Sequence, residues 1–421
     1  MTAAARKPEP RGACPGALRP MQSGDGLIVR VRPHAGALPV ASLIKLAQAA
    51  SHLGNGEIDL TRRANLQLRG LDASGLDELY ETLSQLGLLD ETPEAESIRN
   101  ILVSPLVGRD PSELIDVRET VSELERLLAR DERLWVLPPK FGFVVDGGGM
   151  FSLDGERADI RLSAIDRSHF AVGVDSAQGT SWLGRVSVTE AATAVTRAAE
   201  IFAETLKIGT RARMRDASTD IRNQIAATLG SQAERPTVRP SDRRLGLIDL
   251  GEKGVAVGFG IPFGRLTAGM ARAIATAAQA SGADEIHLSP WRSLYVPLEN
   301  RAAARAVLAS AARQRLVTRS DDPIAAIDAC PGYPACASAC VETRKAARRL
   351  AAMLPSLGIK SAHISGCAKG CARSAKAELV LVGGESDFGI VRNGHADDPP
   401  EARVSSNLDD LPTRLRNLTH G

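Results

Sequence analysis

The stretch that decides the fold is residues 26–68, GLIVRVRPHAGALPVASLIKLAQAASHLGNGEIDLTRRANLQL, because the chain carries it twice. Shifted forward by 228 positions without a gap, it overlays on residues 254–296, GVAVGFGIPFGRLTAGMARAIATAAQASGADEIHLSPWRSLYV, with 12 of 43 positions identical. Alanine matches carry little weight in an alanine-rich chain, but the Gly, Glu-Ile and Leu matches in one register carry more. Both copies have a strand–helix–strand pattern, which predicts two α+β units in tandem.

Each copy is followed by further segments in a matching order: a strand, a helix and a second strand that ends in a glycine turn. We expect these segments at residues 97–105, 111–129 and 140–148 after the first copy, and at 324–331, 335–353 and 378–384 after the second. Further helices are expected at residues 187–206 and 301–314, and the polar residues 213–241 are expected to connect the halves. The second set carries cysteines at its ends where the first has none.

The repeat divides the 421 residues into five parts of an α+β protein, which is more than one ordinary core can hold. We expect an N-terminal arm at 1–20, a first half-domain at 21–90, a first α/β domain with its connection at 91–240, a second half-domain at 241–315, and a second α/β domain at 316–421. Only the last of these would bind metal.

The composition excludes several classes of protein. With 52 basic and 50 acidic residues the net charge is +2, so no global field attracts nucleic acid or a membrane surface. Aromatic residues make up only 3%, which argues against stacking on single-stranded nucleic acid. The apolar runs are short, and the first 21 residues lack the apolar core of a secretory signal. We therefore expect a cytoplasmic protein with no nucleic-acid or membrane partner.

Cysteines give the strongest chemical signal, because five of the six lie within residues 330–371. Cys330-Pro-Gly-Tyr-Pro-Ala-Cys336 and Cys367-Ala-Lys-Gly-Cys371 are two close pairs that can converge from separate loops on one centre. Structural zinc is the alternative, but its ligand pairs are more often two to four residues apart, and the first pair has five residues between its cysteines. The spacing therefore favours an iron–sulfur cluster held by these four cysteines.

Of the two remaining cysteines, Cys340 has the role of a spare ligand as its alternative, and Cys14 is not expected to be a ligand. If a helix starts near Cys336, Cys340 lies one turn further on, and we expect it to be a small buried apolar residue. Cys14 has no partner in sequence and is expected to be a bystander in the N-terminal arm.

Basic residues recur at the ends of several predicted strands. One solvated strand face explains any of them alone, but together they suggest a pocket for a polycarboxylate, because the Arg guanidinium binds carboxylates bidentately. The candidate substrate-binding residues are Arg30, Arg63, Arg69, Arg99 and Lys140. The seven histidines show no metal-ligand spacing, and the chain has no glycine-rich nucleotide motif and no nucleophile elbow.

With its duplication and its C-x5-C…C-x3-C pattern, the chain resembles the sulfite/nitrite reductase haemoprotein family from about Gly24 to Gly384. The resemblance implies two ferredoxin-like half-domains and two α/β domains around a sirohaem that is coupled to a [4Fe-4S] cluster. It implies that Cys330, Cys336, Cys367 and Cys371 hold the cluster, with Cys371 bridging to the sirohaem iron. It also gives catalytic roles to Arg63, Arg99 and Lys140.

Two departures bear on the reaction. The family's second active-site lysine falls on Gly142, and Lys369 replaces the Asn between the last two cysteines. Losing a cation weakens the interpretation as an assimilatory sulfite or nitrite reductase, which must hold a small anion. That reaction stays the alternative, and an iron–sulfur or zinc protein without enzymatic activity is a third interpretation.

The segments RGACPGALRP at 11–20 and GDGLIVRVRP at 24–33 look most like the branch of this family that serves aerobic cobalamin biosynthesis. That resemblance implies a monooxygenase that hydroxylates precorrin-3A with O2 and closes a lactone. An external donor would supply electrons through the cluster, and Arg63, Arg99 and Lys140 would bind the substrate's carboxylates. The iron that activates O2 would be sirohaem or a mononuclear iron.

Overall fold

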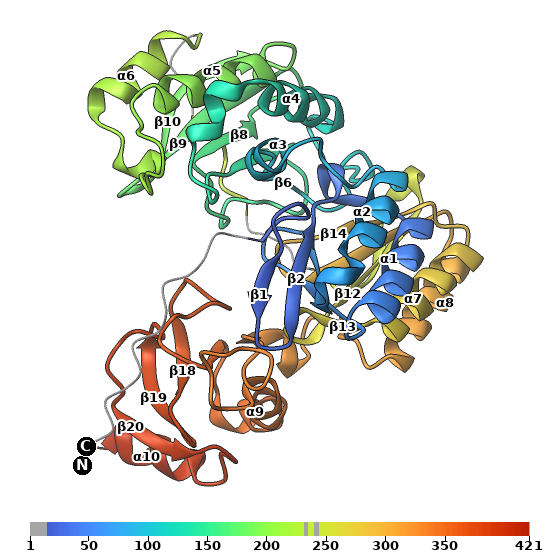
Figure 1. The fold of residues 1–421 in the computed structure, drawn as a ribbon, viewed down its shortest axis with the longest axis vertical. Helices are drawn as coiled ribbons and strands as arrows, with labels where there is room; N and C mark the ends of the chain where they lie inside the picture. Colours follow the sequence, from blue (N-terminus) through green and yellow to red (C-terminus); the bar gives the residue numbers. More distant parts are fainter. Residues whose placement is uncertain (1–14, 231–234, 240–243, 421) are drawn as a thin grey trace.

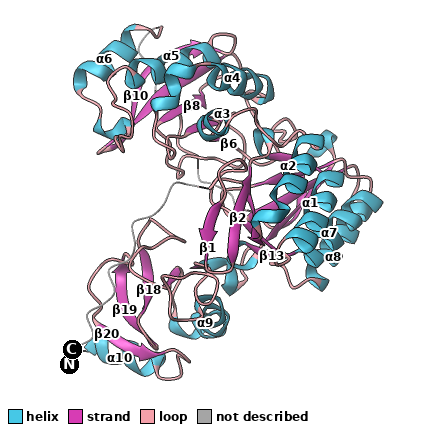
Figure 2. Cartoon of the chain, in the orientation of Figure 1, coloured by secondary structure: helices cyan, strands magenta, loops and turns pink. Residues whose placement is uncertain are grey.

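The structure, a computed structural model, describes residues 15–230, 235–239 and 244–420, which form four sheets of five strands each. The two copies of the repeat form a central unit, and one α/β domain lies at each end of the long axis (Figure 1). Helices cover one side of the central unit, and strands β1 and β2 lie on the opposite side (Figure 2). None of the described helices is long and apolar enough to span a membrane.

The two copies exchange one strand each, so neither sheet belongs to a single copy. The first sheet has the order β1(Met21–Ser23), β2(Gly26–Val31), β5(Leu66–Leu71), β4(Glu57–Leu60) and β13(Arg265–Thr267). The second has the order β11(Gly246–Asp249), β12(Val255–Gly260), β15(Ser293–Leu298), β14(Glu285–Leu288) and β3(Ala37–Pro39). Because β13 comes from the second copy and β3 from the first, the central unit folds as one body.

Helices of both copies share one apolar core. They are α1(Val40–Leu53), α2(Leu76–Gln85), α7(Ala268–Ala280) and α8(Arg301–Arg313). The buried faces of α1 and α7 pack against each other through small and branched residues such as Leu46, Ala50, Ile274 and Ala278. Helix α1 buries Val40, Leu43, Leu46, Ala47 and Ala50, the helical period that the sequence shows.

Unusual backbone angles repeat with the sequence and confirm the 228-residue register. Ala35 (φ 48°) and Phe263 (φ 56°) are left-handed at matching positions, and so are Ala64 (φ 52°) and Arg292 (φ 57°). Residues with a Cβ rarely adopt this conformation, so its recurrence at two matching pairs reflects a common turn geometry.

The two α/β domains have the same topology. The first contains β6(Ile101–Val103), β7(Phe143–Asp146), β8(Ile160–Ala164), β9(His169–Ser176) and β10(Gly179–Ser187), with α3(Pro93–Ile98), α4(Arg118–Arg130), α5(Ala191–Ala203) and α6(Thr219–Ala227). The second contains β16(Ile327–Ala329), β17(Ala362–Ser365), β18(Ala377–Gly383), β19(Asp387–Gly394) and β20(Ala402–Ser405), with α9(Thr343–Leu357) and α10(Leu411–His420). In each, three parallel strands are followed by two antiparallel ones.

Strand register gives a residue-by-residue match between these domains. Ile101 pairs with Phe143 in the first sheet, and Ile327 pairs with Ala362 at the same place in the second. Counting along each strand from these pairs, Ser104 occupies the position of Cys330. Ser104 donates a hydrogen bond to the carbonyl oxygen of Phe151 at 2.8 Å.

Three expectations about elements are wrong. Residues 97–98 end helix α3, and the strand expected at 97–105 covers only Ile101–Val103. The helix expected from 111 begins at Arg118, because the amides of Leu114 and Ile115 bond to the carbonyl of Gly147 instead of forming a helical turn. The helix expected from 335 begins at Thr343, because the first cysteine loop closes on itself through the Tyr333 amide and the Val341 carbonyl at 2.9 Å.

Candidate functional site

The two cysteine pairs lie on loops that leave neighbouring parallel strands at one edge of the second α/β sheet. Cys330 follows β16 directly, and Cys367 follows β17 after one residue. Parallel strands end at the same edge of a sheet, so both loops start there. Burial raises the pKa of the Cys330 and Cys367 thiols. Charge repulsion from Cys371 raises both pKa values further, and repulsion from Cys336 raises that of Cys367. The structure therefore brings the four predicted ligands into one neighbourhood.

Cys330 has the surroundings of a cluster ligand. Its side chain is buried, and its Sγ accepts a hydrogen bond from the amide of Gly366 at 3.1 Å. Backbone N–H groups aimed at sulfur stabilise cluster thiolates and tune their potential. A Cβ at position 366 would meet that of Ala339 at 2.6 Å, so only glycine lets the two loops approach this closely. The residues present therefore fit an iron–sulfur cluster.

No three His, Cys, Asp or Glu side chains in the described ranges lie close enough together to hold a single metal ion. The expectation for Cys340 is wrong: no helix begins near Cys336, and Cys340 is exposed at the end of the loop that precedes α9. Cys14 lies outside the described residues.

Two of the predicted substrate-binding arginines are engaged inside the protein. Arg69 is buried and forms a bidentate pair with Asp25, with Nε–Oδ2 at 2.9 Å and Nη2–Oδ1 at 2.7 Å. It also donates to the carbonyl of Ala335 in the first cysteine loop at 3.1 Å. Arg99, also buried, forms a bidentate pair with Asp90 at 2.9 and 2.7 Å. Both therefore join structural elements, and their contact with a substrate stays a prediction.

Arg63 lies among carbonyl groups at the edge where β6 and β7 begin. Its Nε donates to Asn100 Oδ1 at 3.0 Å, and its Nη1 donates to the carbonyl of Arg157 at 3.0 Å. Burial lowers the pKa of Arg63 to about 10, and the nearby carboxylates of Glu156 and Asp159 offset this effect only in part. A Cβ at Gly142 would collide with the Arg63 guanidinium, so the missing side chain at Gly142 makes room for Arg63.

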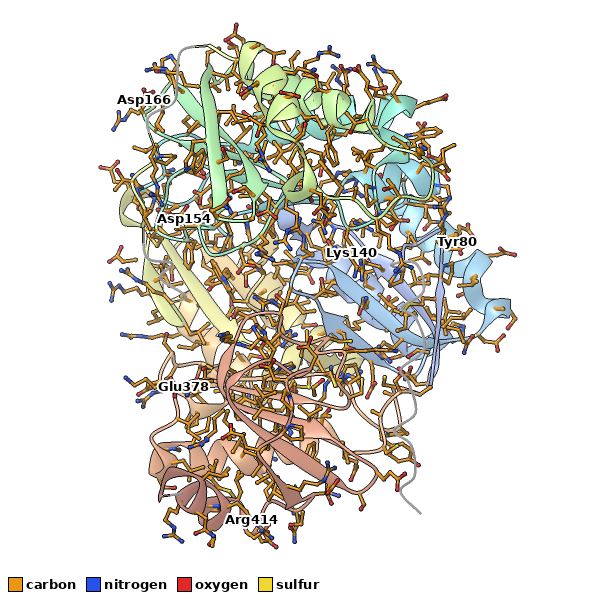
Figure 3. All side chains as sticks on the ribbon, turned by 90° about the vertical axis from the view of Figure 1, so that its left-hand side faces the viewer. Tyr80, Lys140, Asp154, Asp166, Glu378 and Arg414 are labelled. Atoms are coloured by element: carbon orange, nitrogen blue, oxygen red, sulfur yellow. The ribbon has the colours of Figure 1, made fainter. Side chains whose placement is uncertain are left out.

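Lys140 and Arg30 complete the predicted set. Lys140 is exposed just before β7, where the first α/β domain meets the central unit (Figure 3). Arg30 is half-buried on β2. The structure thus places Arg63 and Lys140 at the same edge of the first α/β sheet, while Arg69 contacts the first cysteine loop from the central unit.

A cavity of about 790 Å³ among the described residues is not predicted by the sequence. Its lining includes Arg62, Glu156, Trp291, Arg292, Asp328 and Arg373. Two signals could have pointed to it: Arg373 comes two residues after Cys371, and Arg292 falls where the first copy has Ala64.

Arg292 links the second copy to both cysteine loops. Its Nη1 donates to Asp328 Oδ1 at 2.9 Å, and its Nη2 donates to the carbonyl of Ala372 at 3.0 Å. Asp328 lies two residues before Cys330 and also accepts a hydrogen bond from Arg373 at 3.0 Å. The Arg292 guanidinium therefore connects β16, the strand before the first cysteine loop, to the residue that follows Cys371 in the second cysteine loop.

Comparisons with known proteins agree with this architecture. The model of the nitrite/sulfite reductase ferredoxin-like half domain matches residues 19–86 and again residues 248–312. The solved structure of the Mycobacterium tuberculosis NirA protein superposes with a TM-score of 0.77 at 20% identity, covering 93% of this chain and 80% of that one. The fold is therefore the sulfite/nitrite reductase-like α+β fold.

Curated relatives separate two branches. A precorrin-3B synthase from Sinorhizobium is 38% identical over 94% of this chain and 86% of its own length. A ferredoxin–nitrite reductase from Synechococcus elongatus is 26% identical over 87% of this chain and 77% of its own length. A sulfite reductase from Mycolicibacterium paratuberculosis is 24% identical, over 86% and 70%. The chain belongs to the precorrin-3B synthase family, a branch of the nitrite and sulfite reductase group of oxidoreductases.

Proposed function

We propose that this chain is a precorrin-3B synthase, which hydroxylates the methylated meso carbon of precorrin-3A with O2 and closes a lactone from a ring-A acetate. The observation that carries the proposal is the 38% identity to a precorrin-3B synthase over nearly the whole chain. In the balanced reaction, precorrin-3A, O2, two electrons and two protons give the hydroxy-lactone and water. An external donor supplies the electrons.

Arg63 and Lys140 are the residues that we assign to the substrate's carboxylates. Both lie at the edge where β6 and β7 begin, and Lys140 is exposed there. Arg63 has carbonyl and amide partners rather than a carboxylate, so its charge can balance that of a ligand. Arg30 is assigned an outer carboxylate. Arg99, which is paired with Asp90, and Arg69, which donates to the first cysteine loop, support the site from inside the protein.

Gly142 supports this choice over the reduction of sulfite or nitrite. A lysine at this position would add a cation next to Arg63, and a dense group of cations is what a small oxyanion requires. Here the space is filled by the Arg63 guanidinium, which lies against the Gly142 backbone. A site with fewer, more widely spaced cations fits a large polycarboxylate better than a small anion.

The four cysteines are proposed to hold a [4Fe-4S] cluster, which fits the buried Cys330, the amide donor of Gly366 and the convergence of both loops. When bound, such a cluster accepts and donates electrons one at a time. The chain's own residues keep Cys330 out of solvent and fix the loop carbonyls, as Thr343 does by donating to the carbonyl of Cys330 at 2.6 Å.

The second iron is proposed to be sirohaem or a mononuclear iron, and extraction separates the two. Acid–acetone treatment releases a sirohaem with its own absorption spectrum, whereas a mononuclear iron leaves no chromophore in the extract. Cys371, which is exposed in the middle of the loop between β17 and β18, is the residue that would contact a tetrapyrrole iron.

Turnover of the purified chain tests the proposed function. With a reduced donor and O2, precorrin-3A should be converted to the hydroxy-lactone, and without O2 the conversion should stop. The alternative predicts reduction of sulfite or nitrite with reduced methyl viologen and no change in precorrin-3A. Acid-labile sulfide, measured on the same sample, tests the cluster separately.

A further inference from the structure

Because the chain is duplicated, each residue of the proposed substrate site has a matching position in the second half of the chain. The matching positions line the cavity of about 790 Å³. In the central unit, Arg63 matches Trp291 through the 228-residue shift. In the α/β domains, strand register matches Arg99 with Ala325 and Lys140 with Ile359. Trp291, Ala325 and Ile359 all line the cavity. The cavity is therefore the second copy's counterpart of the proposed substrate site.

The chemistry of the counterpart differs from that of the proposed substrate site. Three positions that are cationic at the substrate site are Trp, Ala and Ile here, so the cavity has apolar side chains beside its charged ones. Phe263, Ile261 and Leu354 add to these apolar side chains. The Trp291 ring is held in place by Glu156, which accepts its Nε1–H at 3.1 Å, and by stacking on Phe151 with 6.3 Å between ring centroids.

Three arginines of the lining lie close to only two carboxylates. The guanidinium groups of Arg62, Arg292 and Arg373 face the carboxylates of Glu156 and Asp328, which leaves an excess of one positive charge. Arg292 and Arg373 share Asp328, at 2.9 and 3.0 Å. Arg62 is the least constrained of the three, since its Nη2 lies 3.9 Å from Glu156. Of the other charged residues in the lining, Asp321 pairs with Arg319, Asp322 caps the turn that begins at Pro323, and Lys360 is exposed.

We infer that this cavity is a second binding site, for an organic carboxylate with a flat apolar body. The carboxylate lies against Arg62, where one negative charge balances the three arginines, and the apolar body lies along Trp291. A volume of about 790 Å³ is in the range of sites for molecules of cofactor size, roughly 300–1,000 Å³. The site is separate from the one assigned to precorrin-3A, and its occupancy can be measured without turnover.

Equilibrium binding of 1-pyrenebutyrate to the purified full-length chain tests the inference, because this probe has one carboxylate on a flat apolar body. We expect one equivalent to bind, with energy transfer from tryptophan to pyrene that Trp291→Phe reduces. Arg62→Gln should weaken binding roughly tenfold, as expected for the loss of one charged hydrogen bond, and Arg62→Lys should restore part of it. The uncharged analogue 1-pyrenebutanol should bind the unaltered chain roughly tenfold more weakly.

Matched controls separate the two sites. Arg301→Gln, which removes an exposed arginine paired with Asp249, should leave the affinity unchanged. Arg63→Gln and Lys140→Gln should also leave it unchanged. If those two variants weaken binding and Arg62→Gln does not, the probe binds at the proposed substrate site and the inference is wrong. Equal affinity for the acid and the alcohol would overturn it as well, as would a failure to bind. Turnover of precorrin-3A, assayed separately, bears only on the proposed function.

Discussion

The loops after β6 and β7 and those after β16 and β17 have the same place in two matching sheets, but they are stabilised by different chemistry. In the second domain, Cys330 and Cys367 lie where the strands end, and the amide of Gly366 points to the Cys330 sulfur at 3.1 Å. In the first domain, Ser104 occupies the position of Cys330 and bonds to a carbonyl oxygen.

In the first domain, carboxylates accept the hydrogen bonds of the loop amides. Asp110 accepts the amide of Met150 at 2.6 Å, Asp146 accepts that of Leu153 at 2.8 Å, and Glu113 accepts that of Gly108 at 2.8 Å. Buried N–H groups must find an acceptor, and either carboxylate oxygen or cluster sulfur can serve. The shared topology therefore supplies loops at the sheet edge whose backbone amides need side-chain acceptors. The side chains on those loops decide whether the amides bond to carboxylates of the same domain or surround a cofactor site.

The largest effect is expected from removing a proposed ligand. Cys367→Ser should lose the acid-labile sulfide, nearly all the iron and all turnover, because serine is a poor ligand for a cluster. The matched control is Cys340→Ser, which changes an exposed cysteine in the same domain and should keep iron and sulfide. Full iron and sulfide in Cys367→Ser, measured by chemical analysis, would show that the ligand assignment is wrong.

A large loss of stability is expected where the two copies join. Asp59 binds Arg265 of the exchanged strand β13 at 2.8 and 2.9 Å and Arg344 of α9 at 3.1 Å, whereas the second copy has His287 at this position. Asp59→Asn removes the carboxylate that pairs with the half-buried Arg344, and it leaves Arg265 with Glu57 alone, so it should lower the free energy of unfolding by about 3 kcal/mol in urea titrations. The control Asp249→Asn breaks an exposed pair and should cost less than about 1 kcal/mol.

The pH dependence of stability follows from the same carboxylate. Burial alone would raise the pKa of Asp59, but Arg344 and Arg265 hold it below its ordinary value. The stabilisation is therefore complete above about pH 4, the unfolded value, and is lost as the pH falls further. Asp59→Asn should flatten this acid limb of the unfolding curve, and an unchanged limb would contradict the assignment.

A smaller effect is expected from making the second copy resemble the first at one turn. Arg292→Ala copies Ala64 and removes the ties to Asp328 and to the Ala372 carbonyl. Chelators should then remove iron several-fold faster, because the second cysteine loop is held less firmly. Arg315→Ala is the control, since Arg315 is also left-handed (φ 57°) but exposed. Equal rates of iron release in both variants would show that Arg292 does not stabilise the loop.

The smallest effect concerns a carboxylate of the first domain. Burial raises the pKa of Glu113 to about 8. A carboxyl group with a raised pKa stabilises the folded state fully below its pKa in the unfolded chain, near pH 4. This stabilisation is lost as the pH rises towards 8, the pKa in the folded state. Between pH 5 and 8.5, the melting temperature of the unaltered chain should therefore fall relative to that of Glu113→Gln. Parallel melting curves would mean that Glu113 titrates normally.

Much of the fold could be predicted because each copy repeats local signals. The helix at Val40–Leu53 and the strands at Glu57–Leu60 and Glu285–Leu288 follow from apolar periodicity and the shared Glu-Ile and Leu positions. The exchange of β3 and β13 could not be predicted, because three-residue strands carry no periodicity and their pairing is decided by tertiary contacts.

The cysteine ligands could be predicted from spacing, whereas the partners of the arginines could not. Arg69 and Arg99 look like free cations in sequence, but Asp25 and Asp90, 44 and 9 residues away, neutralise them in space. Cys340 was assigned to a helix that starts only at Thr343, because the first cysteine loop bonds to itself before the helix begins. The role of Arg292 could not be predicted, because the sequence does not show which loops its side chain contacts.

The most direct test of the central claim is the fate of labelled oxygen. The purified chain, with a reduced donor and precorrin-3A under ¹⁸O2, should form a hydroxy-lactone that contains one ¹⁸O atom by mass spectrometry, and Cys367→Ser should form none. A product without the label, or no product while sulfite or nitrite is reduced, would contradict the account.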